Sequence, residues 1–205
     1  MKKILLVFAK ALSFLYFPNL KRVFRETGSL VRGFYFSRKM KSAGDGIKIY
    51  KMKSCRGIEC FSMGDKVTVS EDCELQAWTR FQKWDYSPEV RIGSNVYFGL
   101  KNHITAINRI EIGDNLLTGQ NVLISDNSHG LFNAESLDTP PAQRKLYSKG
   151  PVMIGNNVWI GDNVCILGGV TIGDNAVIGA NSVVTKSVPA NSAAAGAPAR
   201  IIKKL

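Results

Sequence analysis

The feature that most constrains the fold of this 205-residue chain is a six-residue repeat in its last third. A branched aliphatic residue returns at every sixth position, at Ile154, Ile160, Ile166, Ile172, Ile178 and Val184. Neither the three-and-four spacing of an amphipathic helix nor the alternation of an ordinary strand has this period. An unbroken period of six is typical of a parallel β-helix, and internal repeats outweigh local propensity when a fold is predicted.

Each hexapeptide predicts one short side of a three-sided coil, so three hexapeptides close a turn of eighteen residues. Residues one turn apart should then stack at the ~4.8 Å spacing of neighbouring strands. The expected stacked pairs are Ile154 with Ile172, Ile160 with Ile178, and Ile166 with Val184. The Gly-Asp-Asn and Gly-Asn-Asn triplets are expected at corners, because glycine and asparagine tolerate a positive φ.

The same period extends, with interruptions, back to Met63. Coils are expected at 63–80, 92–109, 112–129, 154–171 and 172–189, with weaker ones before and after them. The segments 81–91 and 130–153 break the period and are predicted to be loops. We therefore predict an all-β fold with an N-terminal helical arm. Its expected divisions are an arm at 1–45, a parallel β-helix domain at 46–195 and a C-terminal tail at 196–205.

The positive charge of the chain is concentrated in the arm. The net charge is +11, and residues 1–41 carry ten basic residues against the single acid Glu26. The nearly neutral remainder argues against a nucleic-acid partner, whereas a basic arm with apolar runs suits an anionic membrane surface. The apolar run before Pro18 is interrupted by Lys10 and is too short to span a bilayer. Either an interfacial anchor or a helical cap on the first coil or a neighbouring subunit fits the arm. A helix after Pro18 would place seven apolar residues along one side: Leu20, Val23, Phe24, Leu30, Val31, Phe34 and Tyr35.

Histidine offers the clearest candidate for chemistry. His129 stands where the long segment 130–153 leaves the coil, and imidazole is well suited to take a proton near neutral pH. The second histidine, His103, either reaches the same cleft or is an outward-facing coil residue. Asp126 and Asn127 either orient the His129 ring, as acceptor-site residues, or only shape the turn. The four cysteines form no CxxC pair, so no metal site or disulfide framework is expected.

Four segments resemble the hexapeptide-repeat acetyltransferases: 125–129, 156–161, 178–186 and 196–200. Within that family they resemble the bacterial sugar O-acetyltransferases of surface-polysaccharide synthesis, which are related to galactoside and maltose acetyltransferases. The resemblance extends over about residues 90–203. It implies a left-handed parallel β-helix and a homotrimer, with acetyl-CoA lying in the groove between adjacent subunits.

The resemblance also implies roles for single residues. His129 matches the general base, and Trp159 a tryptophan beside the thioester or the acceptor. Positions along the coenzyme A groove match Ala180, Thr185 and Lys186, and basic residues near its nucleotide end match Arg200 and Lys203. Cations suit the phosphates of that nucleotide. Asp162 departs from the family pattern, which often has serine beside the thioester carbonyl. Because a carboxylate cannot donate to an oxyanion, a backbone N–H would have to serve there.

The expected function is that of an acetyl-CoA-dependent O-acetyltransferase. It would act in the cytoplasm, or at the inner face of the membrane, on a sugar hydroxyl of a bacterial surface polysaccharide or its precursor, free or lipid-linked, by direct transfer without a metal. Acceptor choice is expected in 81–91 and 130–151, with Trp84 as one contact. The alternatives are an N-acyltransferase of an amino sugar or nucleotide sugar and a non-catalytic β-helix binding protein. A hydratase resembling the γ-carbonic anhydrases would need three histidines, and the chain has two.

Overall fold

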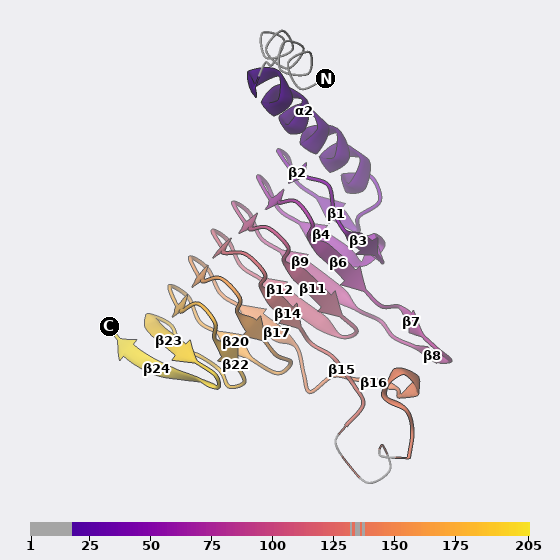
Figure 1. Cartoon of the computed structure of the whole chain (residues 1–205), viewed down its shortest axis with the longest axis vertical. Coiled ribbons are helices and arrows are strands. Elements are labelled where there is room, and N and C mark those ends of the chain that lie inside the picture. Colours follow the sequence, from indigo (N-terminus) through magenta and orange to yellow (C-terminus); the bar gives the residue numbers. More distant parts are fainter. Residues whose placement is uncertain (1–17, 132, 134–135, 137) are drawn as a thin grey trace, which may run out of the picture.

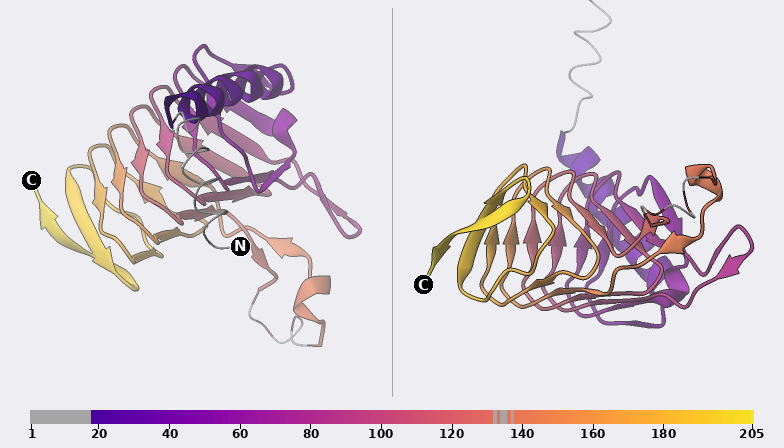
Figure 2. Two further views of the ribbon diagram at one scale, coloured as in Figure 1. Left: turned by 45° about the horizontal axis from the view of Figure 1, so that its top comes forward. Right: turned by 90° about the horizontal axis from the view of Figure 1, so that it is seen from below.

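The structure, a computed structural model, describes residues 18–131, 133, 136 and 138–205 and is a three-sided parallel β-helix (Figure 1). Helix α2 (Pro18–Ser37) lies at one end of the stack, and the pair β23–β24 lies at the other. Two excursions project from one edge (Figure 2). The first seventeen residues of the expected arm lie outside the described part of the chain.

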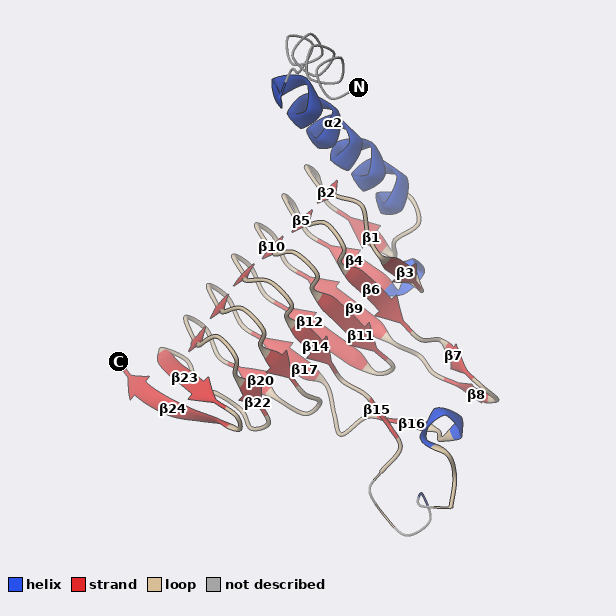
Figure 3. Ribbon diagram, in the orientation of Figure 1, coloured by secondary structure: helices blue, strands red, loops and turns tan. Residues whose placement is uncertain are grey.

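The three sides of the stack are three sheets, here called faces A, B and C (Figure 3). Face A contains β1 (Ser42–Ala43), β4 (Phe61–Met63), β9 (Glu89–Ile92), β12 (Arg109–Ile112), β17 (Val152–Ile154) and β20 (Thr171–Ile172). Face B contains β2 (Lys48–Ile49), β5 (Thr68–Val69), β10 (Tyr97–Phe98), β13 (Leu117–Thr118), β18 (Trp159–Ile160), β21 (Val177–Ile178), β23 (Ser192–Gly196) and β24 (Ala199–Lys204). Face C contains β3 (Ser54–Arg56), β6 (Glu74–Ala77), β11 (His103–Ala106), β14 (Leu123–Ser125), β19 (Cys165–Ile166) and β22 (Val183–Val184).

The expected stacking of aliphatic residues is confirmed. Ile154 pairs with Ile172, Ile160 with Ile178, and Ile166 with Val184. These side chains are buried in one hydrophobic core that extends through every coil. The six-residue period therefore predicted both the inward residues and their register.

Turn length varies, and one corner accounts for the variation. The eighteen-residue turn separates Ile154 from Ile172, but twenty residues separate Ile92 from Ile112 and sixteen separate Ile172 from Val188. Relative to the eighteen-residue turn, the extra or missing residues always lie between face C and face A. This position is called here the third corner. Both excursions leave the stack at this corner, so two corners keep the coil regular and the third is free to carry loops.

Asparagine and glycine occupy the other two corners for different reasons. The asparagines take the positive φ, as expected, with values of 56° at Asn157 and 58° at Asn175. The glycines of the triplets do not. A Cβ at Gly155 would overlap the carboxylate of Asp174 in the next coil, so close approach requires glycine there.

Helix α2 packs on the first coil through its polar side. Glu26 accepts a hydrogen bond from the Tyr50 hydroxyl at 2.6 Å, and Arg32 Nε donates to the Ile49 carbonyl at 2.8 Å. A Cβ at Gly33 would overlap the carbonyl oxygen of Ile47. The apolar side faces away from the protein, with all seven predicted residues exposed. Within the described residues, no helix is long and apolar enough to cross a membrane.

The segment boundaries differ in detail from the expected ones. Residues 89–91 belong to strand β9, so the first excursion is confined to the residues before them. Likewise, residues 152 and 153 belong to β17, and residues 42 and 43 form β1 rather than part of the arm. The tail does not leave the coil freely, because β24 pairs antiparallel with β23 and covers the last edge of face B.

Candidate active site

The two excursions form one substructure beside the third corner. The first is a hairpin of β7 (Arg80–Phe81) and β8 (Trp84–Asp85), and the second contains β15 (Ser128–His129), β16 (Leu146–Tyr147) and the short 3-10 helix η2 (Pro141–Gln143). The Tyr86 hydroxyl accepts a hydrogen bond from the Leu146 amide at 2.9 Å and donates to its carbonyl at 3.3 Å. Segments sixty residues apart in sequence are thereby held together.

His129 lies on β15 at the start of the second excursion. Its backbone pairs with Leu146 of β16, and its exposed ring meets the Phe81 ring edge-on, with centroids 5.5 Å apart. The imidazole lines a cavity of about 390 Å³, called here the histidine cavity. The lining residues are Gln76, Trp78, Phe81, His103, Thr105, Leu123, Ser125, Asn127, His129 and Leu146.

The histidine cavity has an apolar wall and a polar wall. Trp78 and Phe81 supply aromatic surface, whereas Gln76, His103 and Thr105 supply hydrogen-bonding groups from face C. His103 Nε2 lies 3.2 Å from Gln76 Oε1, and burial lowers the pKa of His103, which favours its neutral ring. Among the described residues, no aspartate, glutamate, lysine or arginine lines this cavity. The arrangement suits a neutral molecule rich in hydroxyl groups.

His103 and His129 therefore face the same cavity, which was one of the two alternatives for His103. The carboxylate of Asp126 is engaged by backbone amides. Its buried carboxylate accepts hydrogen bonds from the amides of Ile107 at 2.9 Å and Asn108 at 2.8 Å. Burial raises the pKa of Asp126, and these donors oppose the shift.

Asn127 has a similar structural task. Its Nδ2 donates to the Thr105 carbonyl at 3.0 Å, so it ties the root of the second excursion to the coil beneath. Neither Asp126 nor Asn127 has a described hydrogen bond to the His129 ring, and both shape the turn that carries it.

The residues expected to bind coenzyme A divide into two groups. Thr185 and Lys186 lie at the third corner, directly after β22, two coils along from the turn that carries His129. Ala180 lies at the opposite edge of β22. Between the two levels, a second cavity of about 380 Å³ runs along the third corner from Asn127 to Gly168. This cavity joins the root of β15 to the next coil at Gly168, one coil before Lys186.

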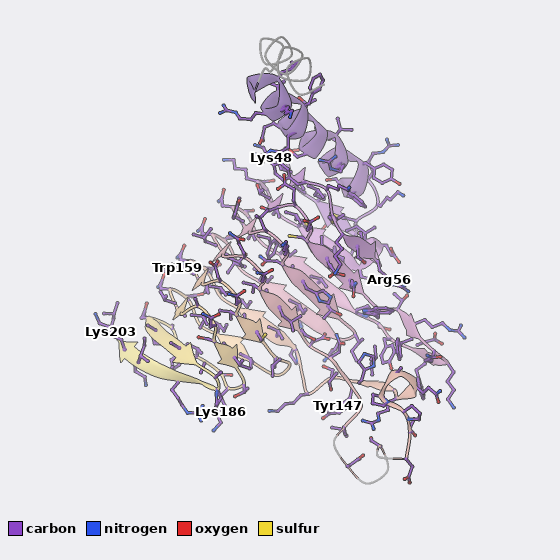
Figure 4. All side chains as sticks on the ribbon, viewed as in Figure 1. Lys48, Arg56, Tyr147, Trp159, Lys186 and Lys203 are labelled. Carbon is purple, nitrogen blue, oxygen red and sulfur yellow. The ribbon has the colours of Figure 1, made fainter. Side chains whose placement is uncertain are left out.

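The second group lies on face B, away from His129. Trp159 points outward from β18 with 55% of its surface exposed, and Arg200 and Lys203 project from β24. Figure 4 shows Trp159 and Lys203 at the edge of the molecule opposite Tyr147, while Lys186 lies toward the excursion. A single chain does not bring these residues to His129.

Two expected site residues have neighbours that indicate other tasks. Asp162 accepts a hydrogen bond from the Gln120 amide at 2.7 Å, as corner carboxylates and amides do at several levels of the stack. Trp84 does not line the histidine cavity. It lines a neighbouring cavity of about 420 Å³ in the second excursion, together with Arg144 and Tyr147. The binding roles of Asp162 and Trp84 remain predictions.

Sequence reasoning missed Trp78 and Gln76, and it included Phe81 only as the first residue of the segment 81–91, where acceptor choice was expected. The available signal was the position of the two aromatic residues, which flank the point where the first excursion leaves face C. Aromatic side chains at the base of a loop are common in binding sites. The contact of Phe81 with His129 depends on the hairpin conformation, which the repeat does not encode.

The stacked hexapeptides of this chain place it in the class of hexapeptide-repeat transferases. The family model described as bacterial transferase hexapeptide (six repeats) matches residues 151–186. The chain is 41% identical over 143 residues to galactoside O-acetyltransferase of Escherichia coli (strain K12). That match covers 67% of this chain and 64% of the relative, so the chain spans slightly less than two thirds of it.

A second relative has similar coverage. The chain is 45% identical over 147 residues to the putative lipopolysaccharide biosynthesis O-acetyl transferase WbbJ of the same strain, covering 70% of this chain and 71% of the relative. The chain therefore belongs to the hexapeptide-repeat transferases, and its β-helix is left-handed as expected.

Solved structures agree on the fold. A maltose O-acetyltransferase from Clostridium difficile 630 is 30% identical, with a TM-score of 0.59, covering 92% of this chain and 83% of that one. Galactoside acetyltransferase in complex with coenzyme A is 28% identical, with a TM-score of 0.57, covering 84% and 69%. The N-acyltransferase AntD from Bacillus cereus, in complex with dTDP and 3-hydroxybutyryl-CoA, has a TM-score of 0.68 at 20% identity, covers 84% and 87%, and is similar in fold alone.

Proposed function

We propose that the chain is an acetyl-CoA-dependent O-acetyltransferase that acetylates a sugar hydroxyl of a bacterial surface polysaccharide or its precursor. The observation that carries this proposal is the exposed His129 ring, which lines a cavity whose described lining residues include no Asp, Glu, Lys or Arg, two coils from Lys186 along the third corner. The names of the two relatives, galactoside O-acetyltransferase and a putative lipopolysaccharide O-acetyl transferase, support a sugar acceptor.

The uncharged lining favours a hydroxyl over an amine as the acceptor. An amino sugar carries an ammonium group near neutral pH, and a carboxylate would stabilise it in a partly buried site. In the part of the chain that the structure describes, no carboxylate lines the histidine cavity. N-acylation of an amino sugar is therefore the second candidate, and AntD supports it through the shared fold alone.

In the proposed reaction, His129 acts as the general base. Its ring removes the proton of the acceptor hydroxyl as the oxygen attacks the thioester carbonyl carbon, and a tetrahedral oxyanion forms. The carbon–sulfur bond then breaks, the acetyl ester remains on the sugar, and the imidazolium returns the proton to the coenzyme A thiolate. Since the thioester is already activated, the base and the positioning of two substrates carry the reaction.

We place the donor along the third corner. Lys186 and Thr185 would contact the pantetheine arm or the phosphates, and the path past Gly168 would bring the thioester toward β15. The carboxylate of Asp162 already accepts the Gln120 amide, so oxyanion stabilisation is assigned to a backbone N–H.

Trp159, Arg200 and Lys203 would reach the donor from a neighbouring subunit, because within one chain they lie on face B. We therefore propose a homotrimer in which face B of one subunit approaches the third corner of the next. Three exposed apolar side chains, Tyr97, Leu117 and Trp159, are stacked along face B and would be covered by this contact.

The arm would hold the enzyme at the cytoplasmic face of the membrane. Helix α2 exposes its apolar side and carries basic residues that include Arg22 and Arg25, a combination that suits an anionic lipid surface. Such contact would place the site near lipid-linked acceptors.

Replacement of the base tests the proposed reaction. His129→Ala should lower kcat by about 10²- to 10⁴-fold, since a positioned base contributes this much, and leave the KM for acetyl-CoA nearly unchanged. Thiol release from acetyl-CoA with a panel of sugars measures both constants. Acceptor-dependent turnover at the wild-type rate in His129→Ala would contradict the proposal.

A further inference from the structure

Three aromatic rings line one side of the histidine cavity in a connected row. Trp78 follows β6, where its amide donates to the Ala106 carbonyl at 2.8 Å, and Phe81 lies on β7. The two rings meet edge-to-face, with centroids 5.8 Å apart and planes at 81°. The His129 ring then meets Phe81 at 5.5 Å and 68°.

The outer end of this row is fixed by a cation. The Arg56 guanidinium carbon lies 4.2 Å from the centroid of the Trp78 ring. Arg56 is not among the residues that line the cavity. Its guanidinium makes a cation–π contact with the indole of Trp78 and does not contribute a charge to the lining. Trp78 is thus held between Arg56 and Phe81, while part of its surface lines the cavity.

Opposite and beside these rings lie neutral hydrogen-bonding groups. Gln76 and His103 interact with each other at 3.2 Å, and Thr105 continues the same strand of face C. The neutral form of His103 presents one donor and one acceptor. The cavity therefore has an aromatic wall and a wall of neutral hydrogen-bonding groups, and the His129 imidazole also lines it.

We propose that Trp78 and Phe81 are the specificity-determining wall of the acceptor site and stack on the apolar face of a neutral pyranose ring. This inference rests on the proposed O-acetyltransferase function and names its substrate class. A pyranose has C–H groups on its ring faces and hydroxyls around its rim, so an aromatic wall with polar groups beside it matches both. The volume of about 390 Å³ is within the range of small-molecule sites.

The geometry also explains how a bound pyranose would bring one of its hydroxyl groups to His129. Because Phe81 touches both Trp78 and His129, a sugar stacked on this wall has its rim beside the imidazole. The uncharged lining disfavours a uronic acid and an amino sugar, since neither charge would find a partner. The preferred acceptor is therefore a neutral hexopyranoside.

Binding can be measured without turnover. His129→Asn protein, saturated with coenzyme A, is titrated with methyl hexopyranosides and observed by saturation-transfer NMR. We expect signal transfer to the ring C–H protons of at least one neutral pyranoside, and its loss in the His129→Asn/Trp78→Ala double variant. The absence of binding by every neutral pyranoside, or equal binding to both proteins, would overturn the proposal.

Steady-state kinetics with the full chain provides the second readout. Trp78→Ala should raise the KM for the sugar about 3- to 10-fold, as expected for loss of a stacking contact, with the KM for acetyl-CoA unchanged. Trp78→Phe should restore most of the affinity, because a smaller aromatic ring still stacks. Phe81→Ala should raise the sugar KM and also lower kcat, since the ring positions His129.

Arg80→Ala is the matched control. Arg80 precedes Phe81 on β7, its side chain is 70% exposed, and its ionic partner Asp85 lies 3.8 Å away, outside the cavity. We expect this variant to keep the wild-type constants. An unchanged sugar KM in Trp78→Ala and Phe81→Ala, while His129→Ala is inactive, would refute the aromatic wall but leave the proposed function intact. Full activity in His129→Ala would refute the proposed function itself.

Discussion

At the corners of the coil, single asparagines have two structural tasks. Asn175 takes a φ of 58°, a region that most L-residues avoid. Its Nδ2 also donates to Asn191 at 2.8 Å, and its Oδ1 accepts from Asn157 at 3.1 Å. The backbone strain and the side-chain ladder can therefore be separated by choosing two substitutions at this position.

Asn175→Ala should destabilise the protein by about 1–2 kcal/mol, because alanine suffers the steric cost of positive φ and the ladder is also broken. Asn175→Gly should cost less than about 1 kcal/mol, since glycine accepts this φ and only the exposed hydrogen bonds are lost. Urea unfolding at a fixed protein concentration measures both values. Equal destabilisation by the two variants would show that strain is not the dominant effect.

The sequence could identify His129 because its position is tied to the end of a recognisable coil. It could also place Lys186 at a corner, because the period of six is unbroken up to Val184, two residues before Lys186. It did not indicate Trp78, and it included Phe81 only within the segment 81–91. The contact of Phe81 with His129 depends on two excursions whose conformations come from tertiary contacts such as that of Tyr86 with Leu146. Asp162 was assigned by analogy, whereas its hydrogen bond to Gln120 marks it as a corner residue.

Among the elements, helix α2 has the least usual surface. Its polar side is used for packing, through Glu26, Arg32 and Gly33, and its apolar side is left exposed, with Phe24 68% and Phe34 73% accessible. The sequence predicted the amphipathic helix but not the direction of its apolar side. That direction follows from close packing of Gly33 on the first coil, which periodicity alone does not reveal.

Removal of this apolar surface tests the proposed membrane contact. The double variant Phe24→Asp/Phe34→Asp should lose at least about 10-fold in affinity for phosphatidylglycerol vesicles, because each buried phenylalanine contributes about 1.5–3 kcal/mol. Ile202→Asp, at an equally exposed apolar residue of β24, is the control and should bind as the wild type does. Co-sedimentation of the full chain measures binding. Equal binding by the double variant, or equal affinity for phosphatidylcholine vesicles, would contradict the contact.

In the molecule as a whole, the three faces differ in chemistry. Face A carries a ladder of ion pairs that links Lys41, Glu89, Arg91, Glu111 and Arg109. Face B exposes the apolar row of Tyr97, Leu117 and Trp159, and face C contains the histidine cavity. Because water solvates ions well and apolar rows poorly, face B is the side expected to contact another subunit.

Leu117→Arg should therefore weaken the proposed homotrimer and reduce turnover in proportion, since in that proposal Trp159 and Lys203 would no longer reach a neighbouring site. Thr171→Arg introduces the same side chain at an exposed position of face A and should preserve assembly. Sedimentation velocity reports the oligomeric state, and thiol release reports activity. A dissociated Leu117→Arg protein with full turnover would show that one chain suffices.

The return of β24 along β23 has a consequence beyond local pairing. Each coil presents its hydrogen-bonding edge to the next, so nothing within the repeat itself specifies where growth should stop. Strand β24 runs antiparallel to β23, and the turn between them is too short to begin another coil. A further parallel coil would therefore find neither a strand of the required direction nor a corner to continue from. Helix α2 packs on the first coil, so both ends of the stack are covered. End-to-end association of β-helices into filaments is thereby disfavoured.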